Sequence, residues 1–159
     1  MAVIEDLMAT KLVIVSPKQT VREAAAQMDQ NGVGAVLVVG EESGSPRLMG
    51  LFSERDLLHR VVVEGLDPGA TSVLAVMTKD PVTVEPDTPI RHCAEVIREK
   101  GFRHLPVVRE GRPVGILSTR DFQEYVVRGL ESFIDEARYR EALAEGQDPY
   151  DHFGGSYGR

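Results

Sequence analysis

The chain has 159 residues, of which 42% are hydrophobic and 27% charged, and its formal net charge is −7. This length suits one compact domain or two small halves that share a core, and the hydrophobic share excludes wholesale disorder. The acidic balance argues against nucleic-acid binding, and no apolar run reaches the roughly 20 residues that span a bilayer. The acidic N-terminus predicts no secretory signal, and the single cysteine, Cys93, fits a reducing cytoplasm.

The negative charge is concentrated at the end of the chain. Residues 131–159 contain seven acidic and three basic residues, and five of the nine aromatic side chains. The preceding residues are nearly balanced in charge and rich in aliphatic side chains. The two compositions predict different roles for the two parts.

Two copies of one pattern occupy the first 130 residues. A shift of 69 residues superposes identical residues in the first part of each copy: Met8 on Met77, Pro17 on Pro86, and Gly32 on Gly101. After Val39 the shift is 65 residues, because the turn at 41–46 is longer than its counterpart. It then superposes the second set: Gly50 on Gly115, Ser53 on Ser118, and Asp56 on Asp121. We therefore predict a tandem repeat of about 60 residues, joined near residues 65–69.

Each copy is predicted to form a strand, a helix, two strands and a second helix. Short β-branched runs at 13–15 and 82–84 end at prolines, as strands do. In the first copy Thr20 and Glu23 predict a capping box, and Gly32 ends the helix. In the second copy Thr88 is expected as N-cap, Pro89 as the first helical residue and Gly101 as the stop.

The middle strands are apolar and the segments around them are amphipathic. Residues 35–39 and 105–108 are predicted to be strands buried on both faces, followed by strands at 48–52 and 113–117. Short amphipathic segments at 3–8 and 72–77 precede the copies. We predict an α/β chain of two β-α-β-β-α repeats packed with pseudo-twofold symmetry, with domains at 1–65 and 66–130, and a C-terminal helical extension and tail at 131–159.

The string Gly-x-x-Ser-x-Arg-Asp recurs at residues 50–56 and 115–121, where a strand ends and a helix begins. By itself it indicates a capping box. The carboxyl end of a strand is also where α/β sheets open ligand crevices. A carboxylate there accepts hydrogen bonds from a ribose diol, while the serine and arginine suit phosphate, and the glycine leaves room for close approach of the ligand. The pattern therefore also suits a nucleotide.

Residues 1–130 resemble the tandem cystathionine-β-synthase-type domain pair, or Bateman module. The resemblance is carried by the strand-proline junctions at 13–17 and 82–86, the segment 101–108 and both serine-aspartate strings. It implies regulatory binding of an adenosyl ligand (AMP, ADP, ATP, NADH or another NAD-type dinucleotide, or S-adenosylmethionine) in two clefts between paired sheets. It also implies a homodimer and an unidentified regulated partner.

The resemblance also implies individual roles. Asp56 and Asp121 would bind ribose, and Arg103 and His104 would reach phosphate. The base would lie against residues 11–13 and 80–82, and against 33–36 or 102–105. The implied binding set is Lys11, Val13, Val36, Ser53, Arg55, Asp56, Asp80, Val82, Arg103, His104, Ser118, Arg120 and Asp121. Because Gly34 and Ala35 replace Arg103 and His104 in the first copy, that site is expected to be less cationic.

Other chemistry is weakly indicated. Cys93 lies on the apolar face of its helix and is expected in the core rather than on a metal. No Ser-His-Asp or Cys-His arrangement can be assembled, so we expect no enzyme, no catalytic residue, no metal site and no covalent cofactor. Apolar spacing continues the last helix to about residue 143, packed on the module or on a dimer mate. Residues 147–159 are expected to be a flexible end or a docking peptide. A dimerisation and protein-interaction scaffold without nucleotide sensing remains the alternative function.

Overall fold

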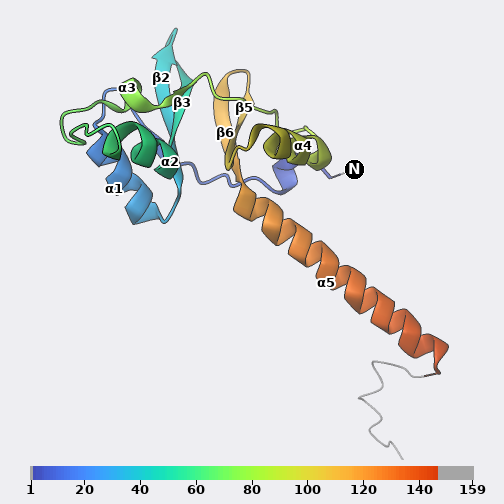
Figure 1. Cartoon of the computed structure of the whole chain (residues 1–159). Coiled ribbons are helices and arrows are strands. Elements are labelled where there is room, and N and C mark those ends of the chain that lie inside the picture. The colour runs from blue at the N-terminus through green and yellow to red at the C-terminus, as the bar shows by residue number, and fades with distance from the viewer. Residues whose placement is uncertain (1, 147–159) are drawn as a thin grey trace, which may run out of the picture. The chain divides into compact units, whose positions relative to one another are not determined.

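The protein is described by a computed structural model, which covers residues 2–146 (Figure 1). It divides into two units, residues 2–122 and the chain from Gln123 onward. The first unit contains both copies of the repeat. The second is the greater part of the last helix.

The first copy contains β1 (Ile14–Val15), α1 (Val21–Asn31), β2 (Ala35–Glu42), β3 (Ser45–Ser53) and α2 (Glu54–Asp56), which continues as the π-helix η2 (Leu57–Val62). The 3₁₀ helix η1 (Ile4–Asp6) precedes it. The second copy is preceded by α3 (Val73–Val76) and β4 (Thr78–Lys79) and contains α4 (Ile90–Lys100), β5 (His104–Arg109), β6 (Arg112–Ser118) and α5 (Thr119–Ala144). The predicted α/β order is confirmed, except that residues 82–84 form a single parallel bridge, Val84 to Val107, instead of a strand.

The two sheets have corresponding orders. The first runs β1-β2-β3-β4, with β1 parallel to β2 and the other pairs antiparallel. In the second, β5 and β6 pair antiparallel, Val84 bridges the β5 side, and Ala9 bridges Ile116 of β6. Each sheet is therefore completed at one edge by the segment that leads into the other copy. This exchange joins the two copies, each of which at about 60 residues would bury only a small core by itself.

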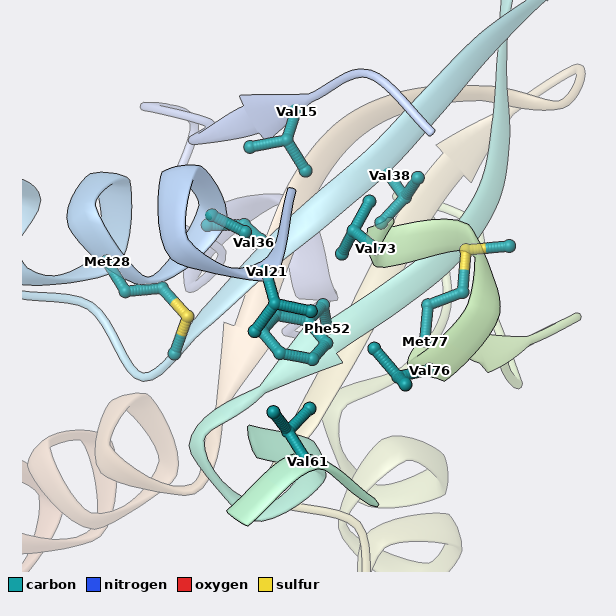
Figure 2. Close-up of a cluster of buried hydrophobic side chains, with 11 residues drawn as sticks. Val15, Val21, Met28, Val36, Val38, Phe52, Val61, Val73, Val76 and Met77 are labelled. Carbon is teal, nitrogen blue, oxygen red and sulfur yellow. The ribbon is translucent and has the colours of Figure 1, made fainter. Parts of the chain in front are cut away.

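The leading segments also exchange their apolar side chains. Val73 and Val76 of α3 are buried with Phe52 in the core of the first copy, where Figure 2 shows the Phe52 ring among Val21, Val61 and Val76. Ile4 of η1 is fully buried in the core of the second copy with Leu105. The two leading segments are therefore amphipathic because each buries its apolar side in the core of the other copy.

The strands β2 and β5 bury both faces, since residues 35–38 and 105–107 are buried in succession. On β2, Val36 and Val38 point into the core of the first copy, whereas Leu37 joins a separate cluster with Leu51 and Ile116. Since Ile116 belongs to β6, this cluster packs the sheet of one copy against the sheet of the other. The expectation of doubly buried strands is confirmed.

The local helix signals behave as predicted, with one correction. Thr20 Oγ1 accepts a hydrogen bond from Glu23 N at 3.2 Å, and Glu23 Oε2 accepts one from Thr20 N at 2.8 Å. Gly32 and Gly101 end their helices in the left-handed region, at φ of 62° and 70°. Thr88 is not the N-cap of α4, because its hydroxyl instead accepts from Glu85 N in the preceding turn. Pro89 therefore takes the N-cap position.

Helix α5 is 26 residues long, so the predicted continuation of the last helix is confirmed. None of its residues is buried. Phe122 packs, partly buried, against the second core. The larger apolar side chains beyond it are at least 39% exposed: Tyr125, Val126, Val127, Leu130, Phe133, Ile134, Tyr139 and Leu143. Within residues 2–146 no helix is both long and apolar enough to cross a membrane. The docking-peptide prediction for 147–159 falls outside the described residues.

Candidate functional site

The serine-aspartate string of the first copy forms the predicted capping box. Ser53, with extended backbone, ends β3, and its hydroxyl accepts from Asp56 N at 3.3 Å. Asp56 Oδ2 accepts from Ser53 N at 3.0 Å and from Ser53 Oγ at 3.1 Å. The strand-to-helix junction therefore fixes one oxygen of the Asp56 carboxylate.

The Asp56 carboxylate has further partners in the leading segment of the second copy. Thr78 Oγ1 donates to it, lying 3.2 Å from Oδ1 and 3.4 Å from Oδ2. Arg60 Nε lies 3.6 Å from Oδ1, and Arg60 Nη1 donates to the carbonyls of Val76 and Met77 at 3.2 and 2.7 Å. Asp56 is 7% exposed, and among the described residues it is the sole charged or polar residue in the buried class. Its burial is compensated by these hydrogen bonds and by the guanidinium charge.

The second copy repeats the capping box. Asp121 Oδ2 accepts from Ser118 N at 2.7 Å and from Ser118 Oγ at 2.9 Å, and Ser118 Oγ accepts from Asp121 N at 3.3 Å. The positions that correspond to Thr78 and Arg60 are Ala9 and Tyr125. Ala9 has no hydroxyl, so the two carboxylates have different surroundings.

A cleft of about 420 Å³ lies beside Asp56. Its walls come from the serine-aspartate junction of the first copy, the segment that leads into the second copy, and the junction between α4 and β5. The lining residues are Gly34, Leu51, Ser53, Glu54, Arg55, Asp56, Arg60, Thr78, Asp80, Pro81, Val82, Lys100, Gly101, Phe102, Arg103 and His104. The cleft thus combines residues of both copies.

This cleft brings together seven of the thirteen residues that the sequence singles out. They are Ser53, Arg55, Asp56, Asp80, Val82, Arg103 and His104. The two copies contribute different parts of the cleft. Ser53 and Asp56 come from the first copy, whereas residues 80–82, which are expected to contact the base, lead into the second copy. The cleft also places Arg103 and His104 with Asp56, so the cleft of the first carboxylate is the cationic one, contrary to the expectation from Gly34 and Ala35.

The other six residues lie outside this cleft. Ser118 and Asp121 form the second capping box, and Arg120 is exposed beside them. Lys11 is exposed, and Val13 packs against the first core. Val36 does not line this cleft, because its side chain is fully buried opposite Phe52 in the β2–β3 register.

Arg103 and His104 line the first cleft, but their backbone pairs with the strand-to-helix junction of the second capping box. His104 is the register partner of Ser118 between β5 and β6, and the Arg103 carbonyl accepts from Thr119 N at 2.9 Å. Burial lowers the pKa of His104 below its ordinary value of 6.5, and Arg103 also lowers it, while the carboxylates of Glu54 and Asp121 act in the opposite direction. His104 is therefore a largely neutral imidazole at pH 7.

The two motif glycines have a different role from the one expected. A Cβ on Gly50 would lie 2.5 Å from Met77 Sδ and 2.8 Å from the Thr78 carbonyl oxygen. A Cβ on Gly115 would overlap Met8 Sδ and lie 3.2 Å from the Ala9 carbonyl oxygen. The space above each glycine is filled by the exchanged leading segment, so the glycines serve packing rather than ligand approach.

Four polar or charged cleft residues were not among the predicted binding residues: Glu54, Arg60, Thr78 and Lys100. Arg60 carried a usable signal, because it follows Asp56 by four residues, the spacing of a helical ion pair. The signal at Thr78 was weaker: it has a hydroxyl group, whereas the corresponding residue of the first leading segment is Ala9.

The structure offers little support for other chemistry. Cys93 is fully buried in the second core, as predicted, and burial raises the pKa of its thiol to about 11, so it is a poor nucleophile at neutral pH. Among residues 2–146 no three His, Cys, Asp or Glu side chains are grouped in a way that would hold a metal ion.

Known proteins share this organisation. The CBS domain model matches residues 4–63 and 73–128. The CBS domain-containing protein YhcV of Bacillus subtilis is 36% identical over 121 residues, covering 76% of this chain and 83% of its own.

Solved structures agree. The CBS-domain containing protein ATU1752 from Agrobacterium tumefaciens has a TM-score of 0.69 and 31% identity, covering 78% of this chain and 98% of its own. The CBS domain protein PAE2072 from Pyrobaculum aerophilum, solved in complex with AMP, has a TM-score of 0.68 and 30% identity, covering 76% of this chain and 89% of its own. Two matched segments in tandem, together with these relatives, show that the chain belongs to the CBS domain family, as a tandem CBS pair.

Proposed function

We propose that the protein is a regulatory module that binds an adenosyl nucleotide in the cleft beside Asp56. The supporting observation is the distribution of charge in that cleft. The Asp56 carboxylate lies with Ser53 and Thr78, whereas Arg103 and His104 come from the junction of α4 with β5. A carboxylate accepts from ribose hydroxyls and the cationic side binds phosphate, which divides a nucleotide between the two copies.

The size and lining of the cleft are consistent with such a ligand. A volume of about 420 Å³ is within the range of small-molecule sites. Val82 is 42% exposed and lies with Pro81 in the lining, where it offers an apolar surface to a base. Within the proposal, Asp80 and the backbone of this segment recognise the base edge, and Arg55 supports the phosphate. The AMP complex of the Pyrobaculum aerophilum protein supports an adenine nucleotide as the first candidate.

We assign a second, weaker site to the corresponding residues of the other copy. Asp121 and Ser118 repeat the carboxylate and hydroxyl, and Arg120 repeats Arg55. Lys11 and Val13 correspond to Asp80 and Val82. Gly34 and Ala35 stand where the first cleft has Arg103 and His104, so this site has less positive charge for a polyphosphate.

Isothermal titration with AMP, ADP, ATP, NADH and S-adenosylmethionine tests the proposal. The matched variants are Asp56→Asn and Asp121→Asn, which keep the size of the side chain and part of each capping box. We expect Asp56→Asn to weaken the tighter binding event about tenfold or more, as loss of a charged hydrogen-bond acceptor does. Absence of heat with every adenosyl compound at millimolar concentration would reject nucleotide sensing.

The module is proposed to act on a partner protein rather than as an enzyme. Within residues 2–146 its buried Cys93 is a poor nucleophile, and each motif serine bonds the aspartate of its own capping box rather than a histidine. The single buried cysteine also supports a reducing compartment, and we assign the protein to the cytoplasm.

Helix α5 favours a homodimer. It also favours the second candidate function, an interaction scaffold. It presents a row of exposed apolar side chains, among them Val126, Phe133 and Ile134. Exposed apolar rows of this kind mark interaction surfaces. If the scaffold is the function, partner binding will require α5 and will be independent of every adenosyl nucleotide.

A further inference from the structure

Arg60 connects the cleft carboxylate to the segment between the two copies. Its Nε lies 3.6 Å from Asp56 Oδ1, and its Nη1 donates to the carbonyls of Val76 and Met77. These carbonyls lie at the end of α3. One guanidinium therefore fixes Asp56 relative to the leading segment that supplies Thr78.

The common scaffold of the two copies does not require this connection. In the second copy the corresponding positions hold Tyr125 and Ala9, and Asp121 still forms the complete capping box with Ser118. The capping box therefore forms without an arginine. The contacts of Arg60 are not needed for the box and are specific to the first cleft.

The two oxygens of the Asp56 carboxylate have different functions. Oδ2 accepts both the backbone and the hydroxyl hydrogen bonds of Ser53. Oδ1 is bonded by Thr78 and approached by Arg60, both of which line the cleft. A carboxylate can accept about four hydrogen bonds, so Oδ1 retains capacity for a ligand hydroxyl. The direction in which this unused acceptor position points depends on the orientation of the Asp56 carboxylate.

We propose that Arg60 is a positioning residue that makes the first cleft select ribonucleotides over 2′-deoxyribonucleotides. It fixes Asp56 Oδ1 so that the acceptor position left by Thr78 meets the 2′ hydroxyl of the ribose. This inference depends on the proposed nucleotide binding and adds to it the residue that makes the recognition of ribose selective.

The test measures the ratio of two affinities in one cleft. Titrations of the ¹⁵N-labelled full chain with AMP and with 2′-deoxy-AMP are followed at the amides of Ser53 and Thr78, which report on this cleft separately from the second. We expect the wild-type chain to bind AMP about tenfold more tightly than 2′-deoxy-AMP, the typical effect of one hydrogen bond to a charged group. In Arg60→Gln the ratio falls to about threefold or less, and in Arg60→Lys it is partly restored.

Arg91→Gln is the matched control. Arg91 forms the same i,i+4 pair with Glu95, also at 3.6 Å, on the exposed side of α4, so its loss should leave the ratio unchanged. A general loss of stability lowers both affinities together and cannot change their ratio. If Arg60→Gln does not fold, as judged by its amide spectrum, Arg60→Lys carries the comparison.

The outcomes separate the two proposals. An unchanged ratio in the Arg60 variants, or a wild-type chain that does not distinguish the two ligands, overturns the role of Arg60 and leaves nucleotide binding intact. Amides of Ser53 and Thr78 that respond to neither nucleotide overturn the proposed function, and the role of Arg60 with it.

Discussion

Glu54 and His104 converge above Gly34. A Cβ on Gly34 would lie 3.3 Å from Glu54 Oε2 and 3.4 Å from His104 Cε1. Glu54 begins the motif helix of the first copy, whereas His104 is paired with Ser118 of the second. This contact region thus joins the two serine-aspartate junctions, and His104 is its titratable group in the physiological range.

The stability of the fold should decrease as the solution is acidified. Because burial lowers the pKa of His104 below 6.5, the unfolded chain takes up its proton more readily than the folded chain. The stability contributed by the neutral imidazole is therefore fully present above about pH 6.5 and is lost as the pH falls through the folded pKa. Urea denaturation between pH 5.5 and 8 measures the free energy of unfolding, which should depend less on pH in His104→Gln than in the wild-type chain. An equal pH dependence in the two chains would contradict this assignment.

Nucleotide binding should have the opposite dependence. A phosphate near His104 and Arg103 favours the imidazolium, so AMP affinity should rise as the pH falls from 7.5 to 6, by at most about tenfold per unit for one proton. Isothermal titration in buffers of different ionisation enthalpy measures the proton uptake directly. No proton uptake in the wild-type chain would mean that phosphate does not approach His104.

The two motif aspartates should differ in their contribution to stability. Asp121→Ala removes a capping box, which costs about 1 kcal/mol. Asp56→Ala also removes the acceptor of Thr78 and leaves the Arg60 charge without its carboxylate, so we expect a cost of about 2–3 kcal/mol. Chemical denaturation of the two variants side by side checks this difference, and equal costs would show that the contacts with Thr78 and Arg60 add no stability.

Gly50→Ala and Gly115→Ala should each be destabilised by about 1–3 kcal/mol, because the added methyl meets a methionine sulfur and a carbonyl oxygen of the exchanged segment. Gly69→Ala is the control, since its Cβ makes ordinary contact with Asp67 at 3.4 Å and its cost should be below about 0.5 kcal/mol. Thermal unfolding distinguishes the two groups. Tolerance of alanine at both motif glycines would contradict the packing role.

The exposed side of α5 should determine assembly. Phe133→Glu and Ile134→Glu place a charge among side chains that are 69% and 47% exposed in the single chain, so folding should be unaffected. Light scattering should show a dimer for the wild-type chain and a monomer for these variants, while Ser132→Glu, outside the apolar row, remains dimeric. A monomeric wild-type chain would exclude a dimer formed through α5.

The sequence predicted the features that depend on neighbours a few residues apart. The capping boxes of Thr20, Ser53 and Ser118 and the left-handed Gly32 and Gly101 follow from local hydrogen bonding and backbone sterics. The repeat also made the α/β order visible, because each copy independently showed the same pattern.

The missed features depend on contacts between distant segments. Nothing near Gly50 indicates that Met77 covers it, and the exchange of leading segments exists only once both copies are folded. For the same reason the sequence did not show that Arg103 and His104 would line the cleft of Asp56. Val36 was selected by its position in the strand, but its side chain points into the core.

The most direct test of the central claim is a crystal structure of the full chain grown with saturating AMP. We expect the ribose hydroxyls within hydrogen-bonding distance of the Asp56 carboxylate, the base against Val82, and the phosphate beside Arg103 and His104. An empty Asp56 cleft in crystals grown with AMP, whether or not AMP occupies another site on the chain, would contradict the account.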